Sequence, residues 1–468
     1  MRKPLLSTLL VSLLALASSA CTLGPDYLRP PLETPTAWRV SEKDAGDLAN
    51  TPWWEQFADP VLNDLVHTAL RENKDLLLAA ARVDEFAGRY GFVRAAQFPQ
   101  LGGGFTASRQ RNTIPGTGGP TVFDSYQATL SATWEIDFWG RLRRQSEAAR
   151  AQLLASEEGR RSVILSLVAS VAGAYINLRE LDRELEISRA TAHSRAQSYA
   201  VFRERFAGGV ISILELSQNQ SQYEEALATI PLLEKAIAQQ ENGLSVLLGR
   251  NPGPLARGRT IEQLALPAIP AGLPADLLER RPDIRQAEQT LIAANAQIGA
   301  ARAAYFPSIS LTGLFGYASN SLGRLFEGNS QIWQASAPIS VPLFTAGAIA
   351  GQVQAAEAVQ QQALLSYQKT IQQAFREVND ALIEQNRAHE QLAAQQRQVE
   401  SLERYAATAR LRYDNGYTSY IEVLDAQRSL FNAQLQFTQT RKTQLQAMIN
   451  LYKALGGGWQ PASQQESK

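Results

Sequence analysis

The alternation of hydrophobic and polar residues predicts four β-strands, which occur as two widely separated pairs. The clearest run extends from Ser125 to Phe138, where apolar and polar residues fall on opposite faces because successive side chains of a strand alternate. The apolar set is Tyr126, Ala128, Leu130, Ala132, Trp134, Ile136 and Phe138. Residues 101–110 form its partner run, and the second pair is predicted at 309–317 and 333–343.

About ten residues of such alternation are typical of a strand that crosses an outer membrane. Aromatic residues gather near the strand ends, as they do at membrane interfaces: Phe138, Trp139, Tyr317, Trp333 and Phe344. A soluble antiparallel sheet with one buried face gives the same alternation, so this alternative stays open. Pro338 lies inside the fourth run and removes a backbone donor, which weakens the prediction of that strand.

Long helices are predicted around the strands. Residues 352–414 contain no Gly or Pro, and their apolar residues recur at spacings of three, four or seven. This pattern is typical of an amphipathic helix with coiled-coil character, roughly 95 Å long if unbroken. Shorter helices are predicted at 75–97 and 283–304, where Phe-Pro ends each one, and another at about 212–248.

The chain contains two copies of one repeating unit. The sequence RAAQFP at 94–99 matches RAAYFP at 302–307 with an offset of 208 residues, and Leu-Gly at 248–249 recurs at 455–456. Such self-similarity is the signature of a repeated architecture. The expected organisation is a signal peptide (1–20), an N-terminal tether (21–60), a first repeat (61–250), a linker (251–282), a second repeat (283–458) and a C-terminal tail (459–468).

Four strands are too few to close a barrel, for which eight is about the minimum. An open sheet edge is not tolerated in lipid, because its backbone groups have no partners there. If the strands span a membrane, the protein must therefore be an oligomer. Two chains would supply eight strands and three chains twelve.

The N-terminus predicts export and a lipid anchor. Arg2 and Lys3 precede an apolar stretch, and the small residues 18–20 lead to Cys21, the single cysteine of the chain. This pattern is typical of a secretory signal. It resembles a bacterial lipoprotein signal, in which Cys21 takes lipid and becomes the mature N-terminus. An ordinary secreted protein with a chance cysteine is the alternative.

The composition argues against several functional classes. The 468 residues include 45 basic and 45 acidic ones, so the chain lacks the basic excess of a nucleic-acid binder. One cysteine and three scattered histidines give no basis for a metal site. The sequence has no GxSxG, P-loop or HExxH motif. We expect no enzyme activity and no cofactor other than the covalent lipid on Cys21.

Six stretches together resemble the TolC-like outer-membrane efflux proteins, in their lipidated, OprM-like branch. They are CTLGPDY (21–27), DFWGRL (137–142), LERRPDI (278–284), IGAARAAYFPS (298–308), VLDAQRSLF (423–431) and NLYKALGGGW (450–459). The resemblance implies an α+β membrane protein of two tandem repeats, each with two transmembrane β-strands and long coiled-coil helices. It implies a homotrimer, with a 12-stranded β-barrel in the bacterial outer membrane and a helical barrel in the periplasm.

The same resemblance implies a function. The trimer would be the exit duct of a tripartite efflux system, a passive conduit for small molecules such as drugs. Its partners would be a periplasmic adaptor (membrane fusion) protein and an inner-membrane pump of the resistance–nodulation–division type.

A gate is predicted where the long helices turn. Glu422 and Asp425 are three residues apart and share a helix face, so three chains around one axis would stack two acidic rings. Such rings concentrate cations. The resemblance implies a constricting gate at Ile421, Glu422, Asp425 and Arg428, with closing contacts at Tyr413 and Glu215.

Thr418 stands where some relatives carry an arginine, so one closing salt bridge is expected to be missing. The closed state would then rest more on contacts of Tyr413 with Glu215 and of Asp425 with Arg428. A solvated helix face is the simpler interpretation of these residues, because exposed ion pairs contribute only ~0.2–1 kcal/mol.

A second functional class explains part of the sequence. A lipid-anchored periplasmic coiled-coil scaffold without channel activity would account for Cys21 and the long helices. It would not account for strands flanked by aromatic residues.

Overall fold

The computed structural model describes residues 22–31, 35, 52–113, 120–267 and 277–457, which form two compact units. The first unit contains 22–31, 82–157 and 286–368, and the second contains 35, 52–81, 158–285 and 369–457. Each unit thus combines parts of both repeats. Residues 1–20, Cys21 and the expected tail at 459–468 lie outside the described residues.

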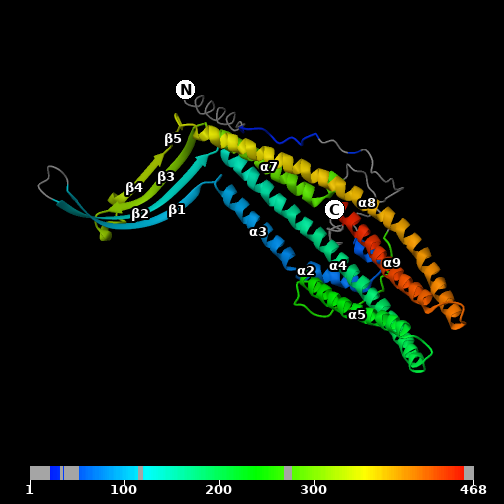
Figure 1. Ribbon diagram of the computed structural model, residues 1–468. Helices are drawn as coiled ribbons and strands as arrows, with labels where there is room; N and C mark the ends of the chain where they lie inside the picture. The colour runs from blue at the N-terminus through cyan, green and yellow to red at the C-terminus, as the bar shows by residue number, and fades with distance from the viewer. Residues whose placement is uncertain (1–21, 32–34, 36–51, 114–119, 268–276, 458–468) are drawn as a thin grey trace. The chain divides into compact units, whose positions relative to one another are not determined.

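The two repeats fold into helices of identical lengths, 22, 67 and 35 residues, which confirms the repeat (Figure 1). In the first repeat these are α3 (Lys74–Ala95), α4 (Arg141–Ala207) and α5 (Ile213–Leu247). In the second repeat they are α7 (Pro282–Ala303), α8 (Ala348–Asp414) and α9 (Tyr420–Ala454). The helices begin and end within a few residues of the predicted bounds.

The first unit holds one antiparallel sheet, in the order β1-β2-β3-β4, with a short β5 that also pairs with β3 (Figure 1). The strands are β1 (Gln100–Thr113), β2 (Pro120–Ile136), β3 (Ser308–Ser319), β4 (Gln331–Ser336) and β5 (Ile339–Ser340). The central pair, β2 with β3, joins the two repeats. Strands β1 and β4 are the edges of the described sheet.

The strand register gathers apolar residues on one face of the sheet. Leu130 lies opposite Gly103 on β1 and Phe315 on β3, and Phe315 lies opposite Trp333 on β4. Leu130, Phe315 and Trp333 remain 65%, 45% and 76% exposed. A soluble sheet would bury such a face against other elements, whereas this one presents it to the surroundings.

The fourth predicted strand is interrupted at the proline. Residues 333–343 were expected as one run, but β4 ends at Ser336 and β5 covers only Ile339–Ser340. Pro338 has no backbone N–H to donate. Its carbonyl still accepts a 3.1 Å hydrogen bond from the Ser310 N–H, so the chain stays beside β3 across the break.

The second unit has a large hydrophobic core in which the predicted tether and linker take part. The 3-10 helix η2 (Trp53–Phe57) precedes α2 (Pro60–Glu72), and both Trp53 and Phe57 are fully buried. Ile261 from the predicted linker is buried in the same core. Apolar burial of this kind stabilises a fold by roughly 25 cal/mol per Å². Residues 52–60 of the predicted tether and 251–267 of the predicted linker are therefore structural parts of the second unit.

The same core explains the most apolar part of α4. An 18-residue stretch of this helix reaches a mean hydropathy of 1.5, enough by length and composition to cross a membrane, yet half of it is buried. Val171, Tyr175 and Ile176 of α4 lie fully buried in the core. We therefore interpret this stretch as a core helix.

A buried aspartate ties the core together. One carboxylate oxygen of Asp59 accepts from the backbone of α2, and the other accepts from the Tyr175 hydroxyl at 2.8 Å and the Arg259 N–H at 2.9 Å. Burial raises the pKa of Tyr175, and its hydrogen bond to Asp59 acts in the same direction. The hydroxyl therefore stays protonated and can donate to the carboxylate.

The repeat also extends to the helix ends. Asn73 donates a 2.8 Å side-chain hydrogen bond to the Leu247 carbonyl at the end of α5. Arg281, one repeat later, donates at 2.9 Å to the Ala454 carbonyl at the end of α9. Both satisfy a carbonyl that has no partner within its own helix.

Candidate functional site

Two tight turns connect the paired helices of the second unit. The α4–α5 turn contains Gly209 with φ 70°, and the α8–α9 turn contains Gly416 with φ 75°. A positive φ favours glycine, which lacks the Cβ that would clash. The Val210 N–H donates to the Arg205 carbonyl, closing the α4 terminus in the manner of a Schellman motif. The turns therefore start α5 and α9 at equivalent places.

The first turns of α9 present three of the predicted gate residues on one exposed face. Ile421 is 60% exposed, and the side chains of Asp425 and Arg428 are 51% and 58% exposed. We call Ile421, Asp425 and Arg428 the α9 stripe, since they lie at positions i, i+4 and i+7. Asp425 and Arg428 form an ion pair of 2.8 Å within the chain.

Glu422 lies at the flank of this stripe and is half-buried. Its carboxylate accepts from the Thr418 hydroxyl and, at 3.4 Å, from Arg412 Nη1. Thr418 thus contacts Glu422 within one chain. Arg412, from the end of α8, brings a positive charge to the same carboxylate.

The two residues expected to form a closing contact have other partners within the chain. Arg205 Nη1 donates to the Tyr413 hydroxyl at 3.0 Å. Glu215 forms a capping box with Ser212: its carboxylate accepts from the Ser212 N–H at 2.8 Å, and the Ser212 hydroxyl accepts from the Glu215 N–H. The hydrogen bonds of the described residues do not join Tyr413 to Glu215.

A groove runs between α5 and the α9 stripe, with a volume of about 510 Å³. The α9 side supplies the stripe and Leu424, and the α5 side supplies only uncharged polar residues. The α5 set is Ser217, Gln218, Ser221 and Gln222. At the repeat offset, Asp425 and Arg428 correspond to Gln218 and Ser221, so the charges belong to the second repeat alone.

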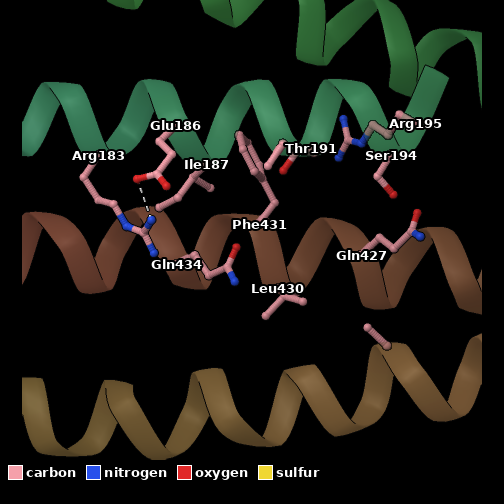
Figure 2. A pocket seen from close by; sticks show the side chains of 12 residues that line it. Arg183, Glu186, Ile187, Thr191, Ser194, Arg195, Gln427, Leu430, Phe431 and Gln434 are labelled. Carbon is pink, nitrogen blue, oxygen red and sulfur yellow. Dashed lines mark hydrogen bonds and ion pairs between the residues drawn. The ribbon is translucent and has the colours of Figure 1, made fainter. Parts of the chain in front are cut away.

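A second groove, of about 390 Å³, is lined mainly by α4 and α9, with Ala406 of α8 at its margin (Figure 2). Arg183 and Glu186 pair along α4 at 2.7 Å. The Phe431 ring on α9 points toward Ile187 and Thr191 of α4 (Figure 2). Arg195 lies over the Phe431 ring at 5.6 Å, and its Nη1 donates to the Gln222 carbonyl at 2.7 Å. Burial lowers the pKa of Arg195. This groove contains none of the predicted gate residues.

Two buried aromatic residues behind the α9 stripe, Phe202 and Tyr420, were not expected from the sequence. Their ring centroids are 4.1 Å apart, and the half-buried Tyr413, which was expected at the gate, packs against them. The signal lay in the repeat itself: Tyr420 corresponds to Ile213, and Phe202 corresponds to Ala409. Phe202 belongs to the first repeat and Tyr420 to the second, so their contact joins the two repeats, and the equivalent residues Ala409 and Ile213 cannot form an aromatic pair.

The residues that follow Cys21 are held where strands meet helices in the first unit. The Leu23 N–H donates to the Trp139 carbonyl at 3.3 Å, and the Trp139 indole donates to the Pro307 carbonyl at 2.8 Å. Arg144, which is almost fully buried, pairs with Asp26 at 2.6 Å. Leu23, two positions after Cys21 in the sequence, is therefore in contact with the strand–helix junction.

Comparison with known proteins gives a consistent result over nearly the whole chain. A family model described as outer membrane efflux protein matches residues 65–250 and 273–457. The toluene efflux pump outer membrane protein TtgF of Pseudomonas putida is 40% identical over 466 residues, covering 97% of each chain.

Two solved structures extend this likeness to the fold. The CmeC outer membrane channel of Campylobacter jejuni is 27% identical with a TM-score of 0.90, covering 94% of this chain and 95% of that one. The open state of the MtrE outer membrane channel of Neisseria gonorrhoeae is 32% identical with a TM-score of 0.86, covering 94% of this chain and 99% of the other.

Proposed function

Because the chain belongs to the outer membrane efflux protein family, we propose that it forms the exit duct of a tripartite efflux system. The duct is a homotrimer whose twelve strands close a barrel in the outer membrane and whose helices stand in the periplasm. It receives small organic molecules from a periplasmic adaptor and an inner-membrane pump of the resistance–nodulation–division type. The name of the relative TtgF, a toluene efflux protein, supports cargo of this kind.

The exposed apolar face of the sheet is the observation that carries this proposal. Leu101, Leu130 and Trp333 are 83%, 65% and 76% exposed on a sheet whose opposite face is mostly polar. Apolar residues outside and polar residues inside are the arrangement of a barrel wall in lipid. The scaffold alternative requires a covered apolar face, so the same observation argues against it.

The proposed lipid on Cys21 fits the place of the residues that follow it. Leu23 is hydrogen-bonded to Trp139, between the end of β2 and the start of α4. A lipid attached two residues earlier would enter the membrane beside the strand ends. The anchor and the barrel would then meet the same leaflet.

We assign the gate of this duct to the α9 stripe with Glu422. Three copies around one axis would place Glu422 and Asp425 in acidic rings, which favour cations. The Arg428–Asp425 pair is exposed, so it is weak enough to break and re-form when the gate moves.

The test of the duct and its gate is ion selectivity in a planar lipid bilayer. The purified full-length protein is expected to form channels that prefer cations in a salt gradient. The double variant Glu422→Gln with Asp425→Asn is expected to shift the reversal potential toward zero. Glu186→Gln removes one acidic side chain from α4 outside the stripe and is the matched control. Channels whose reversal potential is the same in all three proteins would contradict the acidic rings, and a protein without channel activity would contradict the duct.

A further inference from the structure

Tyr420 is the first residue of α9 and directly precedes the α9 stripe. The stripe residue Ile421 is 60% exposed, whereas Tyr420 is 3% exposed. Its ring contacts Phe202 of α4 at 4.1 Å and Tyr413 of α8 at 5.0 Å between centroids. The start of the gate-bearing helix is therefore inserted into a cluster built by two other helices.

The hydroxyl of Tyr420 adds a third helix to this contact. The Asn219 amide of α5 donates a 2.8 Å hydrogen bond to it, and Asn219 is itself only 2% exposed. Burial raises the pKa of Tyr420, while hydrogen bonds with Ser198 and Asn219 act in the opposite direction. The phenol stays neutral at physiological pH. A buried amide that lost this partner would be left unsatisfied, which is costly.

The first repeat has no counterpart of this arrangement. Ile213 is equivalent to Tyr420 and is 61% exposed. Ala426 is equivalent to Asn219 and has no side-chain amide to donate. The charged pair Asp425–Arg428 is likewise present only in the second repeat. The buried Tyr420 and the charged residues Asp425 and Arg428 therefore all lie on α9, and the equivalent helix α5 has none of them.

We propose that Tyr420, held by Asn219 and Phe202, is a positioning residue that fixes the α9 stripe against the α4–α5 hairpin in the closed duct. This inference rests on the proposed gate. Any opening that moves the start of α9 away from α5 must break the Tyr420–Asn219 hydrogen bond. Opening by a rigid movement of both hairpins would leave the bond intact.

The test is the conductance of Tyr420→Phe in a planar bilayer. This variant keeps the ring and its packing but leaves the Asn219 amide without its partner. Losing such a hydrogen bond changes an equilibrium constant by roughly 3- to 10-fold, and we expect the ratio of open to closed channel to rise by about that factor. Reversal potentials should stay as in the wild type, because Glu422 and Asp425 are unchanged.

Tyr223→Phe is the matched control. Tyr223 lies on α5 as Asn219 does and stacks on Tyr199 of α4 at 5.9 Å, and it makes no ring contact with Phe202 or Tyr420 among the described residues. The same loss of one hydroxyl there should leave conductance unchanged. The double variant Tyr420→Phe with Asn219→Ala should open no more than the more open of the two single variants, because both substitutions remove the same Tyr420–Asn219 hydrogen bond.

The outcomes separate this inference from the proposed function. A purely structural role would lower the heat resistance of the oligomer on a gel without changing the open fraction. If wild-type channels form and Glu422→Gln with Asp425→Asn alters their selectivity, but Tyr420→Phe behaves like Tyr223→Phe, the positioning role is wrong. If no channels form at all, the proposed function itself fails.

Discussion

Glu184 and Glu180 lie one turn apart on the same face of α4, and their side chains are almost fully buried. Lys442 of α9 pairs with Glu180 at 2.9 Å, and the Gln439 amide donates to Glu184 at 3.1 Å. One lysine thus faces two carboxylates. Burial raises the pKa of Glu184, and the neighbouring charge of Glu180 raises it further.

This arrangement predicts that stability falls as the pH rises. A carboxyl whose folded pKa lies above its unfolded value binds its proton more tightly in the folded state. Its contribution is complete below the ordinary glutamate pKa of ~4.3 and is lost as the pH rises through the raised value. Glu184→Gln should therefore unfold at a higher temperature than the wild type at neutral pH, with the difference vanishing near pH 4.

Thermal unfolding followed by circular dichroism across this pH range measures the effect. Glu186→Gln is the control, because Glu186 lies on the same helix with 65% of its side chain exposed. A wild type and a Glu184→Gln variant with parallel pH profiles would show that Glu184 titrates normally.

The sequence predicts the exposed or buried face of a residue well where helical or strand periodicity determines it. It predicts contacts poorly where the two residues belong to different repeats. The exposed face with Ile421, Asp425 and Arg428 follows from helical spacing. The cluster of Phe202 with Tyr420 joins residues more than 200 positions apart, and no local pattern brings them together. Comparing the two repeats position by position would have singled out both residues.

At the scale of elements, the prediction succeeded because the helices are long and uninterrupted. Residues 352–414 have neither Gly nor Pro, and α8 includes all of them. The strands were predicted from alternation, and the fourth failed at Pro338, where the ladder loses a donor. The burial of Trp53 and Ile261 had no periodic signal, because neither residue lies in a regular amphipathic stretch.

The two hairpins allow a matched test of helix capping. Ser212 caps α5 with its side chain and forms a capping box with Glu215. Ser419 is at the equivalent position before α9 but makes no side-chain cap hydrogen bond. Replacing a serine that caps a helix by alanine costs ~1 kcal/mol. Ser212→Ala should therefore destabilise the first turn of α5, while Ser419→Ala should leave α9 nearly unchanged.

Amide hydrogen exchange in the first turn of each helix measures this difference. We expect faster exchange near Glu215 in Ser212→Ala and unchanged exchange near Glu422 in Ser419→Ala. Equal effects of the two substitutions would mean that the capping box does not stabilise α5. The Glu215 carboxylate would then be available for the contact with Tyr413 that the family resemblance implies.

At the scale of the whole molecule, the edges of the sheet decide the assembly. In the described sheet, β1 pairs with β2 along its full length, and β4 pairs with β3. The outer sides of β1 and β4 would expose unpaired backbone groups, which lipid does not tolerate. Since β1 and β4 run in opposite directions within the alternating sheet, β4 of one copy can continue antiparallel into β1 of the next.

Paired cysteines on these two edges count the chains that close the barrel. Thr106 on β1 and Gln334 or Ser336 on β4 lie on the mostly polar face of the sheet. A disulfide requires Cα atoms about 4.4–6.8 Å apart, so only strands in direct register become linked. We expect oxidised membranes that carry Thr106→Cys with Gln334→Cys or with Ser336→Cys to give covalent trimers on a denaturing gel.

The single variants are the controls, since one edge cysteine has no partner across the junction and should leave monomers. The native Cys21 is the same in every sample. A ladder that stops at the dimer would mean that two chains close an eight-stranded barrel, because each copy would use both of its edges on one neighbour. Monomers in both double variants would mean that β1 and β4 do not meet in either of these two registers.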